Sequence, residues 1–252
     1  MSFEVAAESY DRFMGRYSTQ LSAGLADLAG VAAGQTALDV GCGPGALTAE
    51  LVARLGPGSV AAVDPSEPFV AAARDRNPGV EVRRAPAEKL PFEDGAFDAA
   101  LAQLVVHFMA DAVGGLREMA RVTRPDGVVA ASVWDMAGER APISPFWVAA
   151  RRLRPDAQDE AGLAGARQGH LAHLFAEAGL RDVEVAELDA TVTYESFEEW
   201  WQPYLAGVGP AGAYATSLSD EERSELRESC RAVLPEAPFA VTATAWAARG
   251  HA

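Results

Sequence analysis

The part of the sequence best suited to chemistry is a glycine-rich turn within residues 36–47, Thr-Ala-Leu-Asp-Val-Gly-Cys-Gly-Pro-Gly-Ala-Leu. The apolar run before the turn carries one acid, Asp39, and suits a short strand that is buried on both faces. The glycines permit positive φ angles and let a ligand approach the backbone where a side chain would collide. A helix beginning at Ala46 would point its positive end into the turn, which favours a bound carboxylate or phosphate.

A second acid stands at the end of the next predicted strand, residues 59–63. This acid, Asp64, comes about 20 residues after the glycine turn, where the ribose of a nucleotide lies in many α/β sheets. A carboxylate can accept hydrogen bonds from both ribose hydroxyls. Asp64 could equally be the N-cap of the helix predicted over residues 67–76, because Asp is a preferred capping residue.

The string Leu-Asp-Val-Gly-Cys-Gly-Pro-Gly, residues 38–45, resembles the first motif of class I S-adenosylmethionine-dependent methyltransferases. It is far more specific than the G-x-G-x-x-G pattern of dinucleotide-binding turns, which Gly41, Gly43 and Ala46 match loosely. Three further segments carry the same resemblance, 64–69, 85–98 and 121–127. The resemblance implies a Rossmann-like doubly wound α/β sheet of seven strands with an antiparallel last strand. It also implies methyl transfer from S-adenosylmethionine.

The resemblance further implies how the cofactor is held. The glycine turn would bind the amino-acid part, Asp64 the ribose, and the segments around Phe69 and Glu88 the adenine. Pro86 stands where the family commonly has an Asp that receives the adenine amino group, so the Ala87 N–H and the Glu88 carboxylate are the remaining candidates. Glu88 could also be a solvated loop charge. The candidate cofactor-binding residues are Arg16, Asp39, Gly41, Cys42, Gly43, Asp64, Pro65, Phe69, Ala87, Glu88 and Gln103.

An aromatic and basic cluster at residues 10–17 is expected to link two helices, predicted over residues 4–13 and 19–28. It could form a flap over the ligand, in which Arg16 binds a carboxylate and Tyr10 or Phe13 lines a cleft. It could equally be a hydrophobic staple onto the sheet, since aromatic side chains are commonly part of a core. Both interpretations remain open from the sequence.

His107 is the catalytic candidate. It follows the strand predicted over residues 99–104, whose carboxyl end should lie at the ligand edge of the sheet. Similar methyltransferases often have two consecutive histidines at this point, where this chain has Val106-His107. An oxygen or nitrogen acceptor would benefit from a base here. A packed or surface histidine with a satisfied hydrogen bond is the alternative.

Alternating strand and helix patterns through residue 134 predict a parallel sheet with right-handed crossovers. We treat residues 1–252 as one methyltransferase domain, with an N-terminal helical flap at 1–31 and two inserts at 136–166 and 194–238. Helices are predicted over 145–154 in the first insert and over 197–205 and 220–234 in the second. Inserts of this kind often form a lid over a substrate pocket, and a helical cap or a dimer face is the alternative. The aromatic residues that suggest a lid are Phe146, Trp147, Trp200, Trp201 and Tyr204.

The composition limits the partners. A net charge of −15 disfavours nucleic acid as a substrate, because an acidic surface repels phosphate backbones. Only two cysteines occur, one of them inside the glycine turn, so we expect no disulfide and a cytoplasmic location. No metal-ligand spacing and no apolar run of ~18 residues is visible, so neither a metal site nor a membrane span is expected.

The predicted function is therefore methyl transfer from S-adenosylmethionine to an oxygen, nitrogen or carbon atom of a small, partly apolar molecule. One alternative is a nicotinamide-dependent oxidoreductase on a Rossmann sheet. The other is a module that binds S-adenosylmethionine without catalysis.

Overall fold

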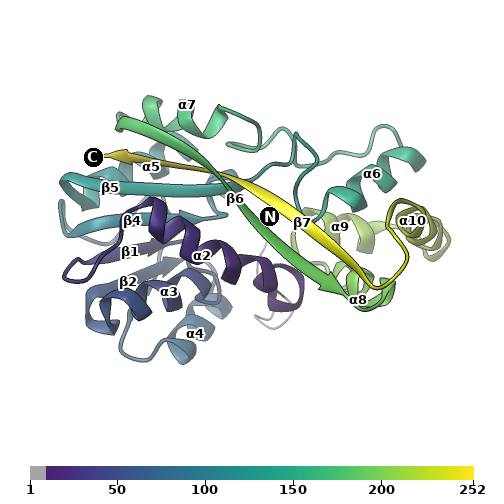
Figure 1. Ribbon diagram of the computed structural model, residues 1–252, viewed down its shortest axis with the longest axis horizontal. Helices are drawn as coiled ribbons and strands as arrows, with labels where there is room; N and C mark the ends of the chain where they lie inside the picture. The colour runs from purple at the N-terminus through teal and green to yellow at the C-terminus, as the bar shows by residue number, and fades with distance from the viewer. Residues whose placement is uncertain (1–9) are drawn as a thin grey trace.

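A computed structural model describes residues 10–252 as one seven-stranded sheet with helices on both faces (Figure 1). The strand order is β3-β2-β1-β4-β5-β7-β6, and β7 runs antiparallel to both of its neighbours. The sheet predicted from the resemblance is thus confirmed. The strands are β1 (Ala37–Val40), β2 (Val60–Asp64), β3 (Glu81–Arg84), β4 (Phe97–Gln103), β5 (Thr123–Trp134), β6 (Arg181–Tyr194) and β7 (Phe239–His251).

Strands β1 and β2 lie inside the sheet, with a paired strand on either side, and every one of their residues is buried. Both strands are apolar except for one aspartate each, as expected for parallel strands that helices cover on both faces. They pair in parallel, and β1 also pairs in parallel with β4. The carboxyl ends of the three strands therefore meet at one edge of the sheet, where open α/β folds bind ligands.

Helices and short helical turns connect the strands (Figure 1). The glycine turn leads from β1 directly into a helix, and a short 3-10 turn that contains His107 follows β4. Beside the sheet lie α2 (Arg16–Leu28), α3 (Ala46–Leu55), η2 (Pro57–Ser59), α4 (Glu67–Arg76), η3 (Val106–Phe108), α5 (Ala112–Val122), α6 (Ser144–Leu153) and α7 (His170–Glu177).

The prediction that residues 10–17 link two separate helices is wrong. A π-helical turn, η1 (Asp11–Gly15), continues directly into α2. Gly15 does not break the helix because it adopts a helical φ of −58°. Phe13, Tyr17 and Leu21 recur at every fourth position and are buried on one face, so packing favours a continuous helix. The first predicted helix, residues 4–13, lies largely outside the described residues.

The second insert contains more helix than the two segments predicted. It forms α8 (Phe197–Trp201), η4 (Gln202–Ala206), α9 (Gly209–Ser217) and α10 (Asp220–Val233). The sequence of α9 is rich in Gly and Ala and reads as a loop, yet Ala211 and Ala215 are buried against the core. Figure 1 shows α6 and α8–α10 gathered at one end of the molecule, where the β6–β7 pair extends past the parallel strands.

Cys42 and Cys230 are both free and buried. No helix within residues 10–252 has the length and apolar character that crossing a bilayer requires. The same residues bring no three His, Cys, Asp or Glu side chains together as potential metal ligands.

Candidate functional site

The glycine turn after β1 is held to β2 by its own N–H groups. The N–H groups of Gly41 and Cys42 both donate to the Val63 carbonyl oxygen, at 2.8 and 2.9 Å. The Gly43 N–H donates to Asp64 Oδ2 at 2.9 Å. A pyrophosphate placed at this turn would find these three donors already engaged, which is unfavourable for dinucleotide binding.

Two glycines of the turn are required for different reasons. Gly41 has a φ of +73°, and a Cβ there would lie 2.5 Å from both Cγ atoms of Val105. Close packing therefore fixes this glycine. Gly43 has a φ of +53°, and a Cβ there would meet nothing within 4 Å. The space beside the turn opens at Gly43, so this is where a ligand can approach the backbone.

Asp39 lies buried beneath the turn with one oxygen unused. Its Oδ2 accepts a hydrogen bond from Thr48 Oγ1 at 2.6 Å, whereas Oδ1 has no partner within the described part of the chain. Burial raises the pKa of Asp39 to about 7. A buried carboxylate with an unpaired oxygen is costly unless a cation or a donor reaches it.

Asp64 accepts two backbone hydrogen bonds at the edge of the sheet. Its Oδ2 receives the Gly43 N–H, and its Oδ1 receives the Ser66 N–H at 2.8 Å. Burial also raises the pKa of Asp64. Since a carboxylate offers about four acceptor positions, both oxygens keep capacity for ribose hydroxyls. The N-cap position of α4 is Ser66, so Asp64 is not the cap itself.

The two carboxylates and the open face at Gly43 match S-adenosylmethionine better than a dinucleotide. The α-amino group and the sulfonium of S-adenosylmethionine are cationic and would offset the buried negative charge of Asp39. A pyrophosphate would add negative charge next to two acids. The residues present therefore fit the cofactor that the sequence resemblance implies.

Replacing Asp64 by alanine is expected to weaken binding of S-adenosylhomocysteine, measured by calorimetry, by about 1–3 kcal/mol, the scale of a lost charged hydrogen-bond partner. Asp27→Ala serves as the control, because this aspartate is exposed and pairs with Arg54 away from the turn. Since Asp64 also holds Gly43 and Ser66, the thermal unfolding of the variant must be measured alongside. Unchanged affinity in a folded variant would count against the ribose role.

The candidate adenine-side residues are placed by contacts within the protein. Phe69 is buried and meets the Tyr10 ring edge-on, with centroids 5.3 Å apart. Ala87 is buried as well. Glu88 Oε1 accepts the backbone N–H groups of Ala110 at 2.7 Å and of residue 111 at 3.3 Å. Glu88 is therefore a tether for the segment before α5, and the adenine roles stay predictions.

Pro65 and Gln103 stand beside the same edge of the sheet. The Pro65 carbonyl accepts from Arg84 Nε at 2.9 Å. Gln103 ends β4 and donates to the Ser18 carbonyl at 2.9 Å, while its Oε1 has no partner among the residues that the structure describes. Gln103 therefore joins α2 to the sheet and keeps one acceptor for a ligand, so its predicted place near the methionine part stays a prediction.

Arg16 is engaged away from the glycine turn. Its guanidinium forms an ion pair with Glu199 at 2.6 Å and donates to the Thr193 carbonyl at 2.7 Å. It also lies over the Tyr194 ring, 5.0 Å from the centroid. These contacts join the N-terminal helix to β6 and α8. A role for Arg16 in binding a ligand carboxylate stays a prediction, and it would compete with Glu199.

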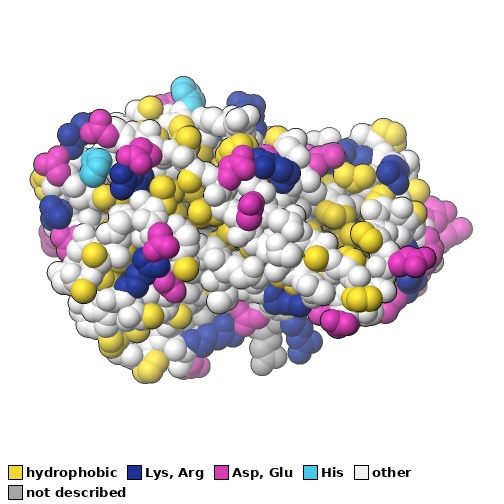
Figure 2. All heavy atoms as spheres, in the orientation of Figure 1, with side chains coloured by type: hydrophobic (Ala, Val, Ile, Leu, Met, Phe, Trp, Pro, Cys, Tyr) yellow, Lys and Arg dark blue, Asp and Glu magenta, His cyan; other side chains and the backbone are white. Residues whose placement is uncertain are grey.

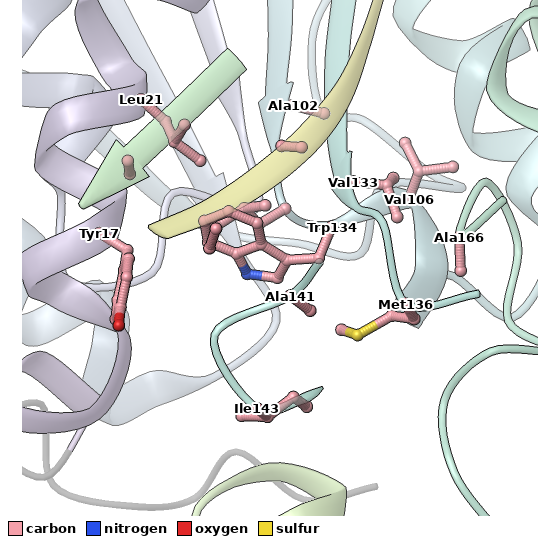
Figure 3. Close-up of a cluster of buried hydrophobic side chains, with 14 of the residues drawn as sticks. Tyr17, Leu21, Ala102, Val106, Val133, Trp134, Met136, Ala141, Ile143 and Ala166 are labelled. Atoms are coloured by element: carbon pink, nitrogen blue, oxygen red, sulfur yellow. The ribbon is translucent and has the colours of Figure 1, made fainter. Parts of the chain in front are cut away.

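A cavity lies where the carboxyl ends of β4 and β5 meet the N-terminal helix and both inserts. Its space between atoms is about 440 Å³, including the open mouth. Figure 3 shows lining residues of this cavity, Trp134, Met136 and Ile143, within a cluster of buried hydrophobic side chains. The lining residues are Tyr10, Phe13, Met14, Leu104, His107, Phe108, Trp134, Met136, Ile143, Glu160, Val208, Gly209, Pro210 and Ala211.

His107 lines this cavity, as its position after β4 suggested, but its ionisation differs from that of a typical base. The side chain is buried, and burial lowers its pKa to about 3. Its Nδ1 has no hydrogen-bond partner within residues 10–252. The ring contacts that of Phe108, with centroids 3.9 Å apart. His107 is therefore a neutral imidazole at physiological pH that offers hydrogen bonding but holds a proton poorly.

Glu160 is the lining residue that the sequence did not reveal. It is 4% exposed, and its Oε2 accepts the indole N–H of Trp147 at 2.9 Å. Burial raises its pKa to about 7. In the sequence it stands in the segment Asp-Ala-Gln-Asp-Glu, which reads as a solvated loop. Only its contact with an aromatic residue 13 positions away could have indicated a buried role.

Comparisons with known proteins agree with this geometry. A family model described as a methyltransferase domain matches residues 38–131. The demethylmenaquinone methyltransferase of Desulfitobacterium hafniense is 30% identical over 177 residues, which cover 62% of this chain and 69% of that protein. The ubiquinone/menaquinone biosynthesis C-methyltransferase UbiE of Cupriavidus taiwanensis is 32% identical over 182 residues, covering 65% and 74%. Some other curated relatives are matched over less of their length, down to 31%.

Among solved structures, the YcgJ protein of Bacillus subtilis superimposes with a TM-score of 0.58, covering 92% of this chain and 97% of that chain. Its sequence is 20% identical, so this likeness shows the fold alone. The family of this chain is shown by the two methyltransferases above, each at least 30% identical and matched over more than two thirds of its length. They place this chain in the family of S-adenosylmethionine-dependent methyltransferases.

Proposed function

We propose that this methyltransferase acts on a small, largely apolar molecule that binds in the cavity between the N-terminal helix and the two inserts. The cavity itself carries the proposal. Its walls are mostly aromatic and aliphatic with a few polar groups, those of Tyr10, His107 and Glu160, as is typical of small-molecule sites. It lies beyond the carboxyl end of β4, and β4 pairs with β1, the strand that leads into the glycine turn. Both inserts contribute residues to its walls, but the aromatic residues that suggested a lid are buried against one another and do not line it, so the lid stays a prediction. They are Phe146, Trp147, Trp200, Trp201 and Tyr204.

The charge distribution supports a small acceptor over a nucleic acid. The chain carries a net charge of −15. On the face that Figure 2 shows, Lys and Arg side chains are interspersed with Asp and Glu and form no continuous basic strip. A nucleic-acid methyltransferase would need such a strip to neutralise phosphates. The cytoplasmic location expected from the cysteine usage remains part of the proposal.

Family membership makes S-adenosylmethionine the cofactor and replaces the nicotinamide alternative. When bound, S-adenosylmethionine supplies an electrophilic methyl group. Gly43, Asp39 and Asp64 would orient it, and the walls around Trp134 and Met136 would exclude water and hold the acceptor in line. Such positioning can supply ~7–11 kcal/mol of the barrier, so the residues need to provide little further chemistry.

The proposed function is tested with ligands and an acceptor library. S-adenosylhomocysteine should raise the melting temperature of the protein, whereas NADH should leave it unchanged, because a ligand stabilises the folded state that binds it. Radiolabelled methyl transfer from S-adenosylmethionine to small aromatic and alicyclic molecules should then be detectable. Binding of S-adenosylmethionine without transfer to any molecule of such a library would favour the non-catalytic module.

Replacing His107 by alanine is expected to lower turnover by about ten-fold, the scale of a lost hydrogen bond of about 1–2 kcal/mol. The affinity for S-adenosylhomocysteine should remain nearly unchanged, because His107 lines the acceptor cavity. Steady-state kinetics with an acceptor that the wild type methylates, together with calorimetry, give both quantities. Full activity in the variant would remove His107 from the catalytic residues.

A further inference from the structure

We propose that Glu160 binds the hydroxyl group of the methyl acceptor and takes up its proton. The acceptor is then an aromatic or alicyclic molecule whose nucleophile is a hydroxyl oxygen. This inference rests on the proposed function and narrows it, because it names the kind of atom that is methylated and the residue that recognises it.

Glu160 lines the cavity, and a hydrogen bond from a neighbouring helix holds its carboxyl group. It stands among the aromatic and aliphatic walls formed by Phe13, Phe108, Trp134 and Met136. Trp147, from α6, donates to Oε2 and so fixes the orientation of the carboxyl group. One hydrogen bond leaves most of the acceptor capacity of a carboxylate unused. A hydroxyl group in the cavity can therefore donate to it.

Arg151 of α6 lines a neighbouring pocket together with Glu160, but among the described residues its guanidinium pairs with Glu139 and Asp159. Within the described residues, the charge that affects its ionisation is that of Asp159, another acid. A buried carboxylate without a cation is costly for stability. The protein keeps this cost in a cavity that is otherwise apolar, which is typical of a functional group rather than of a packing residue.

Three titratable groups line the cavity, and two of them, Glu160 and His107, differ in their ability to take up a proton, whereas burial raises the pKa of Tyr10 to about 12. The pKa of Glu160 is about 7, because burial disfavours its charged form. The pKa of His107 is about 3, because burial disfavours its charged form as well. A base works best when its pKa lies near the working pH. Glu160 is therefore the suitable proton acceptor, and His107 is a neutral neighbour that can hydrogen-bond to the same hydroxyl.

The reaction balances without a further reactant. The acceptor oxygen forms a bond to the methyl carbon while the C–S bond breaks, and the electron pair of that bond stays on sulfur. The hydroxyl proton passes to a carboxylate oxygen of Glu160 and then to solvent through the cavity mouth. Because the carboxylate form is required, recognition of a hydroxyl should strengthen as the pH rises through about 7.

The competing explanation is a structural role, in which Glu160 only accepts the Trp147 N–H and holds its loop. Glutamine would fill that role equally well, since its amide oxygen can accept the same hydrogen bond. Glu160→Gln therefore separates the two explanations. Asp156→Asn is the matched control, because this exposed aspartate four positions away does not line the cavity.

Binding of two probes of nearly equal shape tests the inference without a known acceptor. The dissociation constants of 4-fluorophenol and 4-fluorotoluene are measured by ¹⁹F NMR on the protein saturated with S-adenosylhomocysteine, at pH 6 and pH 8.5. In the wild type and in Asp156→Asn, we expect 4-fluorophenol to bind about ten-fold more tightly than 4-fluorotoluene at pH 8.5. This preference should shrink several-fold at pH 6. In Glu160→Gln it should be small and independent of pH.

Several outcomes would overturn the inference. Equal affinities for the two probes in the wild type, or a preference that Glu160→Gln retains at both pH values, would leave Glu160 with a structural role. Tighter binding of 4-fluorobenzylamine than of 4-fluorophenol at pH 8.5 would assign an ammonium in place of the hydroxyl. If Glu160→Gln fails to fold, the wild type alone still tests the inference. A preference for 4-fluorophenol that is the same at pH 6 and pH 8.5 would contradict it. A hydroxyl preference without methyl transfer would refute the proposed function alone.

Discussion

Asp39→Asn is expected to stabilise the ligand-free protein and, in the same variant, to weaken its binding of S-adenosylhomocysteine. Both effects follow from one buried carboxylate whose Oδ1 has no partner among the residues described. Substitutions that improve stability and impair binding together are expected where a site holds an unfavourable charge for its ligand.

The stability effect has a definite pH dependence. The pKa of Asp39 is about 7 in the folded protein, above its ordinary value of 3.8. The folded state therefore binds the proton more tightly, and this contribution to stability is full below pH ~4 and is lost as the pH rises through about 7. At pH 8 the native protein carries the unfavourable buried charge. Asparagine keeps the acceptor for Thr48 and removes that charge, which should stabilise by about 1–3 kcal/mol.

The binding effect has the opposite sign. The α-amino group of the ligand is cationic and would lie against Asp39, so its neutralisation removes a charged partner and should weaken binding by about 1.5–3 kcal/mol. Urea unfolding at pH 5 and pH 8 and calorimetry with S-adenosylhomocysteine measure the two effects. Asp27→Asn, an exposed aspartate, should change neither. A variant that is less stable at pH 8 and binds normally would show that the carboxylate is a packing residue.

The sequence predicted those features whose determinants are local. The strand β1, the glycine turn and the aspartate that ends β2 were recognised because the apolar runs and turn residues that define them are contiguous. Alternating strand and helix patterns then predicted the parallel part of the sheet. His107 lines a cavity beyond the end of its strand, where the sequence had suggested a ligand edge, and its role stays a prediction. Its low pKa could not be predicted, because it depends on which distant side chains bury the ring.

The features that the sequence missed depend on contacts between distant segments. The sequence did not indicate the partner of Arg16, which is Glu199, 183 positions away, and its role toward a ligand stays a prediction. Glu160 is a candidate for binding the acceptor only because the folded first insert places it in the cavity wall beside Trp147. Helix α9 has too little apolar periodicity to be recognised, and its alanines are buried only because other helices surround them. Local patterns thus predict the scaffold, whereas the acceptor end of the site is a product of tertiary packing.

A steric loss of cofactor affinity is expected for Gly43→Ala. Gly43 has a φ of +53°, and a Cβ there would enter the open space beside the turn. We assign that space to the cofactor, so the added methyl group should collide with the ligand. Steric conflict of this kind costs about 1–3 kcal/mol, which corresponds to a loss of about 5- to 150-fold in affinity for S-adenosylhomocysteine.

The chain offers a matched control in Gly34. It also has a positive φ, +90°, and a Cβ there would also meet nothing within 4 Å, but it lies in the loop before β1. Alanine at either position should cost about 1–2 kcal/mol of folding stability, because the left-handed conformation is unfavourable for a residue with a Cβ. Only Gly43→Ala should then lose affinity. Equal affinities in the two variants, measured by calorimetry at matched fractions of folded protein, would mean that the ligand does not approach the backbone at Gly43. The cofactor would then have to be placed elsewhere along the edge of the sheet.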